Sequence, residues 1–150
     1  IKIRIVGSIL KNYKIFLDAQ INKLGISSNI NFLGIIEFGP KLFKLHKESD
    51  IFILPSCTEG FPHVIWEAAA NCCPVITTNV GVIPKELKNH VDCTLIKSYK
   101  VDETVNAVTS LIGNNRIRGE LIYNAYKKAK KNSIEKCIDK LILEINNEIK

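Results

Sequence analysis

The stretch IFILPSCTEGFPHVIWEAAANCCPVITT, Ile51 to Thr78, decides the fold. It opens with a short apolar run between Asp50 and Pro55, which is typical of a strand buried on both faces of a parallel sheet. A polar loop, an apolar helical segment at 63–71 and a second β-branched run at 74–78 follow. Because parallel strands are joined through helices, this order predicts the repeating unit of an α/β fold.

The same alternation continues on both sides of this unit. Further strands are predicted at 1–6, 30–34 and 94–97, and further helices at 10–24, 41–47, 102–112, 117–130 and 134–149. We therefore expect an α/β fold with a Rossmann-like parallel sheet and helices on both faces. Apolar periodicity through 134–145 indicates that the last helix is packed. At 150 residues and 46% apolar composition, one domain over 1–150 is the expectation.

Composition and short motifs disfavour several classes of protein. No apolar run has the length of a membrane span, and the five cysteines, an odd number, include no CxxC pair of the kind that zinc sites use. No DxD motif is present to hold a metal ion. The net charge of +6 fits diffuse attraction to anions. The cluster KKAKK at 127–131 is typical of a solvated helix face, and no basic-aromatic motif indicates nucleic-acid binding.

Two carboxylates flank the start of the helix predicted at 63–71. The loop from Pro55 to Pro62 leaves a strand at its carboxyl end, where open α/β sheets bind ligands, and enters a helix whose N-terminus favours phosphate. His63, Glu67 and Asn71 share one narrow face of that helix. This stripe either faces water or borders a cleft in which Glu67 and Glu59 accept hydrogen bonds from sugar hydroxyls. His63 either contacts phosphate or a sugar hydroxyl at the start of the helix or points to solvent.

The segment PSCTEGFPHVIWEAAANCCPVITTNVGVIPKEL resembles the donor-binding half of retaining nucleotide-sugar glycosyltransferases of the GT-B fold, family 4 or group 1. The signature is two glutamates with seven residues between them, within EGFP, EA and PV, and with GxxP downstream. The resemblance implies that Glu67 holds the ribose hydroxyls and that Glu59, the catalytic candidate, contacts the transferred sugar. The implied donor-binding set is Glu59, Gly60, Phe61, Pro62, His63, Val64 and Glu67. No metal or other cofactor is implied.

By the same resemblance, the expected activity is transfer of a sugar from a nucleotide diphosphate, with retention, to a glycan or lipid-linked acceptor in polysaccharide biosynthesis. We expect residues 1–150 to be the donor-binding domain of a two-domain enzyme, inactive without its first strand–helix unit, which carries a basic pair, and its acceptor domain. A cytoplasmic location, with peripheral membrane contact, is compatible with this function. The alternatives are a non-catalytic nucleotide-sugar binding module, a truncated remnant and a GT-B sugar-nucleotide epimerase.

Several positions depart from the family pattern or allow two interpretations. Val82 replaces a glycine, and we expect it to resist a positive φ and crowd the donor loop. Asn71 is expected to take the left-handed conformation that ends the helix. Cys57 is interpreted as a small buried apolar residue rather than a reactive thiol. Trp66 is expected to pack in the core rather than stack on a base.

Overall fold

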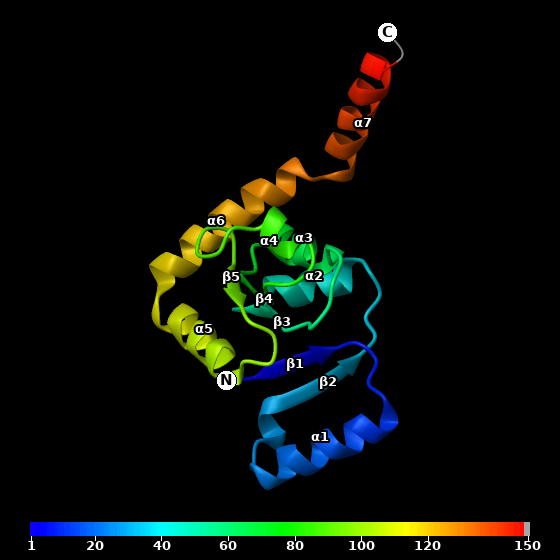
Figure 1. Cartoon of the computed structure of the whole chain (residues 1–150). Helices are drawn as coiled ribbons and strands as arrows, with labels where there is room; N and C mark the ends of the chain where they lie inside the picture. The colour runs from blue at the N-terminus through cyan, green and yellow to red at the C-terminus, as the bar shows by residue number, and fades with distance from the viewer. Residues whose placement is uncertain (149–150) are drawn as a thin grey trace. The chain divides into compact units, whose positions relative to one another are not determined.

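The computed structural model describes residues 1–148 and divides the chain into two compact units (Figure 1). The first comprises Ile1–Leu42, and the second begins at Phe43. Helix α2 (Pro40–Lys47) crosses this boundary. Each unit is an α/β arrangement of parallel strands.

The first unit is a single strand–helix–strand crossover. It consists of β1 (Ile3–Val6), α1 (Lys11–Lys23), a 3-10 turn (Ser27–Asn29) and β2 (Ile30–Gly34). The two strands pair in parallel, with Ile3 opposite Ile30 and an irregularity at Ile5 and Val6. The predicted strands and helix of this part of the chain are confirmed, with ends that differ by one or two residues.

The second unit holds the site predicted from the sequence. In chain order it contains β3 (Phe52–Leu54), α3 (His63–Ala70), β4 (Val75–Thr78), α4 (Ile83–Glu86), β5 (Thr94–Ile96), α5 (Val101–Gly113), α6 (Asn115–Lys131) and α7 (Ile134–Glu148). The three strands form one sheet in the order β3-β4-β5, and both pairs are parallel. Their carboxyl ends therefore lie at the same edge of the sheet.

Helices cover both faces of this sheet, as predicted. Val75, on the central strand, packs in a cluster with Ile65 of α3 and Ile83 of α4. Its neighbour Ile76 packs in a second cluster with Leu111 of α5. Because successive side chains of a strand point to opposite faces, the two clusters are the two sides of one α/β layer structure. All four residues of β4 are buried, which makes it the centre of the core.

The end of α3 corrects one expectation from the sequence. Asn71 has φ −98°, whereas Cys72 takes the left-handed conformation with φ 58°. The Cys73 N–H donates to the Ala68 carbonyl at 2.9 Å and the Cys72 N–H to the Ala69 carbonyl at 3.1 Å, the pair of bonds that defines a Schellman ending. The cysteine therefore accepts the conformation that glycine usually supplies.

Two predicted burial patterns are wrong. In β3 the Ile53 side chain is 37% exposed, because this strand lies at the edge of its sheet and only the central strand is enclosed. Helix α7 forms as predicted, but its described side chains, residues 134–147, are exposed. Residue 149, the end of the predicted helix, lies outside the described residues.

Candidate functional site

Three loops meet at the carboxyl edge of the β3-β4-β5 sheet. Residues 55–62 connect β3 to α3, residues 79–82 connect β4 to α4, and residues 97–100 connect β5 to α5. Because the strands are parallel and adjacent, these loops are neighbours in space. This is the edge at which α/β sheets bind ligands.

Ser56 organises this edge. Its hydroxyl donates to Oε1 of Glu59 at 2.7 Å, which fixes the half-buried carboxylate against its own loop. Its carbonyl accepts from the Thr78 hydroxyl at 2.6 Å and from the Ser98 hydroxyl at 3.5 Å. One serine therefore connects the candidate catalytic carboxylate to all three strands of the sheet. No spacing of residue types in the sequence reveals this role of Ser56.

Gly81 fixes the backbone of the same loop. Its φ is 58°, and a Cβ placed on it would lie 1.8 Å from the carbonyl oxygen of Glu59 and 2.9 Å from that of Gly60. The next residue, Val82, donates its N–H to the Gly60 carbonyl at 3.2 Å. The protein thus requires glycine at position 81, because any side chain would displace the backbone that carries Glu59.

The expectation that Val82 conflicts with a positive φ is wrong. Val82 has φ −90° and ψ −9°, which a β-branched residue adopts without strain, and the positive φ falls on Gly81 alone. The side chain of Val82 is 40% exposed. The family glycine that Val82 replaces is therefore not needed here for backbone conformation.

Glu67 lies in the second turn of α3 and is half-buried. Burial raises the pKa of its carboxyl, and the nearby His63 partly offsets that effect. His63, the first residue of the helix, is exposed, and the Asn71 side chain donates to the Glu67 carbonyl at 2.8 Å. Along the stripe of His63, Glu67 and Asn71, Glu67 is therefore partly shielded from solvent, whereas His63 at the N-terminal end is exposed.

The other predicted donor-site residues line the entry to α3. Pro62 is the N-cap residue, and Val64 is half-buried. A Cβ at Gly60 would meet no atom within 4 Å, so the chain itself does not require glycine there. Phe61 stacks on Trp66 with ring centroids 5.0 Å apart. Trp66 packs against the core, which confirms the prediction for that residue.

Cys57 is exposed, so its interpretation as a buried apolar residue is wrong. It follows Ser56 in the loop that leaves the edge strand, and that position faces outward. Cys73 and Cys93 are the buried cysteines; burial, with Asp92 nearby, raises the pKa of the Cys93 thiol to about 12. Within residues 1–148, no group of three or more His, Cys, Asp or Glu side chains is arranged to hold a metal ion.

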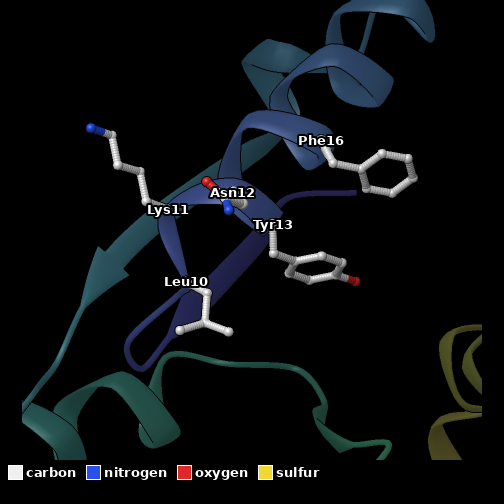
Figure 2. A pocket seen from close by; sticks show the side chains of 5 residues that line it. All are labelled: Leu10, Lys11, Asn12, Tyr13 and Phe16. Atoms are coloured by element: carbon white, nitrogen blue, oxygen red, sulfur yellow. The ribbon is translucent and has the colours of Figure 1, made fainter.

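Two open hollows lie elsewhere in the chain. One, of about 520 Å³, is in the first unit beside α1, where Figure 2 shows the rings of Tyr13 and Phe16 on the same side of the helix. The other, of about 300 Å³, lies between β5 and α5, with Glu103 and His90 among its lining residues. Neither is lined by Glu59 or Glu67, so the convergence of these two carboxylates on one ligand remains a prediction.

Comparison with known proteins assigns the chain to a family. The sequence model of the family Glycosyl transferases group 1 matches residues 1–128, most of the chain. The chain belongs to the group 1 glycosyltransferases.

Relatives of this group 1 glycosyltransferase chain include curated enzymes. It is 29% identical over 112 residues to an uncharacterized glycosyltransferase of Methanocaldococcus jannaschii, and this alignment covers 75% of this chain and 28% of that protein. It is 33% identical over 88 residues to the UDP-Gal:alpha-D-GlcNAc-diphosphoundecaprenol alpha-1,3-galactosyltransferase of Escherichia coli, which covers 59% of this chain and 21% of that protein. The chain thus spans less than a third of either relative.

Among solved structures, HepE of Anabaena in complex with UDP superimposes with a TM-score of 0.87 at 24% identity. The match covers 99% of this chain and 41% of HepE. This similarity establishes that the chain has the fold of one part of a GT-B glycosyltransferase. In residues 1–148 no helix combines the length and apolar character needed to cross a bilayer.

Proposed function

We propose that this chain binds a nucleotide-diphosphate sugar and forms the donor-binding domain of a longer, two-domain enzyme. The enzyme would transfer the sugar, with retention, to a glycan or lipid-linked acceptor. Glu59 and the backbone of residues 60–64 would contact the sugar and the diphosphate, and Glu67 the ribose hydroxyls. The observation that carries the proposal is the carboxylate of Glu59, held by the Ser56 hydroxyl in a loop whose backbone lies against Gly81, at the carboxyl edge of the sheet of a group 1 glycosyltransferase.

The geometry of Glu59 suits recognition of a hydroxylated ligand. One of its oxygens accepts from Ser56 at 2.7 Å, which orients the carboxylate and leaves the other oxygen for a sugar hydroxyl. A carboxylate already held in place loses little side-chain entropy when ligand binds. The loop that carries it leads directly into the N-terminus of α3, where the helix dipole favours a diphosphate.

Glu67 suits the ribose for a different reason. Its partial burial, which raises the pKa of the carboxyl, also lowers the competition from water for hydrogen bonds. Two carboxylate oxygens match the two adjacent hydroxyls of a ribose. His63 precedes Glu67 by one turn and is exposed beside the proposed position of the phosphates.

Similar proteins support the choice of donor. HepE was crystallised with UDP and with UDP-glucose, and the E. coli relative is named as a UDP-Gal-dependent galactosyltransferase that acts on a diphosphoundecaprenol-linked sugar. We infer the same class of donor here. The length of these relatives supports the assignment of the acceptor site to a second domain.

Calorimetry tests this proposal with UDP-, GDP-, ADP- and dTDP-activated hexoses. The full chain should bind at least one of them, and Glu67→Ala should weaken that binding about tenfold or more, because a charge-assisted pair of hydrogen bonds is lost. Glu144→Ala, which removes an exposed carboxylate from α7, is the matched control and should bind like wild type. Binding to none of the panel would favour a remnant. Binding without transfer is expected of this chain, and a non-catalytic module would be favoured only if the two-domain enzyme also bound the donor without transferring its sugar.

Two further parts of the proposal have tests of their own. Transfer without a bound metal predicts that excess EDTA leaves the transfer rate of the two-domain enzyme unchanged, because backbone groups and the helix N-terminus stabilise the leaving diphosphate. A cytoplasmic enzyme in peripheral contact with the membrane predicts salt-sensitive sedimentation with anionic liposomes. The exposed Lys127, Lys130 and Lys131 of α6 supply the charge for that contact.

A further inference from the structure

Tyr99 has an unusual combination of exposure and backbone conformation. Its side chain is 86% exposed in the loop between β5 and α5, so it contributes little to either core cluster. Its φ is 60°, in the left-handed region that favours glycine. A tyrosine here has a strained backbone and receives no compensating burial. Strain of this kind persists where the surrounding structure imposes it, and it is common at ligand sites.

The loop that carries Tyr99 is fixed to the loop that carries Glu59. The Ser98 hydroxyl donates to the Ser56 carbonyl at 3.5 Å. An interaction with the exposed side chain of Cys57, in the loop that carries Glu59, raises the pKa of the Tyr99 hydroxyl. Ser56 is also the residue whose hydroxyl holds Glu59. The ring of Tyr99 therefore stands at the rim of the proposed site.

The rest of the loop holds this position. The Lys97 N–H donates to Oε2 of Glu103 at 2.8 Å, and the Lys100 N–H approaches the Lys97 carbonyl at 3.4 Å. These bonds close the turn on either side of Tyr99. Exposed aromatic residues are ordinary on protein surfaces, and Tyr123 on α6 is one of them, 62% exposed. Tyr99 differs because its backbone has φ 60° and because its neighbour Ser98 is hydrogen-bonded to Ser56 of the loop that carries Glu59.

An exposed aromatic ring near the proposed sugar-binding carboxylate of Glu59 is suited to bind a sugar ring. The C–H groups on one face of a pyranose ring form an apolar surface. The face of an aromatic ring packs on such a surface, while the polar edge of a tyrosine remains exposed to solvent. We propose that Tyr99 is the stacking platform for a pyranose ring bound next to Glu59. This assignment rests on the proposed function. The ring belongs either to the sugar of the donor or to that of the acceptor, and the two are distinguished by experiment.

The decisive variant is Tyr99→Gly. Glycine removes the ring and also suits φ 60°, so any loss of binding is not caused by strain or misfolding. Tyr99→Phe keeps the ring and removes only the hydroxyl. Tyr123→Ala, which removes an exposed tyrosine from α6, is the matched control. Denaturation of each variant checks that the fold is retained.

Two titrations of the full chain identify the sugar. The first compares the best-bound activated hexose of the panel with its nucleoside diphosphate alone. The second adds maltose, as a neutral saccharide, to protein saturated with that nucleoside diphosphate. In one of these titrations, Tyr99→Gly should weaken sugar binding about three- to tenfold. Tyr99→Phe and Tyr123→Ala should bind the sugar with nearly the wild-type affinity. No variant should change the affinity for the nucleoside diphosphate.

A loss confined to the activated hexose assigns the platform to the donor sugar, and a loss confined to maltose assigns it to the acceptor. Unchanged binding of both sugars by Tyr99→Gly overturns the proposal for Tyr99 while the proposed function stands. Absence of nucleotide-sugar binding by the wild-type chain overturns both.

Discussion

Replacing Gly81 by alanine is the most direct perturbation of the loop that carries Glu59. The left-handed φ of 58° costs about 1–2 kcal/mol for a residue with a Cβ. The Cβ would also lie 1.8 Å from the Glu59 carbonyl oxygen, a contact that forces the backbone of one loop to move. Accommodating an extra group in a packed site costs about 1–3 kcal/mol. Gly81→Ala should therefore lower the free energy of unfolding by about 2–5 kcal/mol.

Two glycines serve as controls, measured by urea denaturation. Gly25 has φ 66° with no atom within 4 Å of a Cβ, so Gly25→Ala isolates the backbone strain and should cost about 1–2 kcal/mol. Gly119, inside α6, has neither restriction, and Gly119→Ala should stabilise the protein by about 1 kcal/mol. If Gly81→Ala costs no more than Gly25→Ala, the close approach to Glu59 does not hold the loop and the reasoning fails.

Three further predictions concern single side chains. Ser56→Ala removes the hydroxyl that orients Glu59 and should weaken binding of an activated hexose about fivefold in calorimetry, with little change for the nucleoside diphosphate alone. Burial lowers the pKa of His46, whose Nε2 has no hydrogen-bond partner among residues 1–148. The folded state therefore resists protonation, and stability should fall as pH drops below about 6.5. Urea denaturation at pH 7.5 and 5.5 should show this loss in wild type and a smaller one in His46→Leu; equal losses would exclude His46 as the cause. Lys128→Met leaves the Asp92 carboxylate, which is 9% exposed, without its ion pair and should lower the free energy of unfolding by about 1–3 kcal/mol. Arg116→Met breaks an exposed ion pair and should lower it by less than about 0.5 kcal/mol. Similar losses for the two variants would contradict this reasoning.

The alternation of strands and helices was predictable because it depends on local periodicity. The apolar runs at β3 and β4 and the helix between them are readable from the residues alone. Burial was less predictable, because it depends on which strand is central. The run in β3 is as apolar as that in β4, yet Ile53 is 37% exposed while all of β4 is buried.

Backbone conformation at the ends of elements was also hard to predict. The sequence favours Asn71 as the left-handed residue that ends α3, because asparagine tolerates that conformation. In the structure Cys72 takes it, since the hydrogen bonds to Ala68 and Ala69 form only when the turn falls one residue later. The same limit applies to Val82, because a glycine in the family pattern does not require a positive φ at that position.

The contacts that hold the candidate site could not be predicted at all. Ser56 reaches Glu59 within its own loop, but its bonds to Thr78 and Ser98 join segments 22 and 42 residues away. Gly81 meets Glu59 for the same reason, because parallel strands bring distant loops to one edge. Sequence patterns identify which residues could bind a sugar nucleotide, and the tertiary contacts determine which of them are held in place.

The proposed function requires Glu59 and Glu67 to bind one and the same sugar nucleotide. A crystal structure of the full chain with its best-bound activated hexose tests it most directly. The Glu67 carboxylate should lie within about 3 Å of the ribose hydroxyls, and the Glu59 carboxylate within about 3 Å of a hydroxyl of the sugar. A ligand that lies away from the start of α3, or that contacts neither carboxylate, would contradict it.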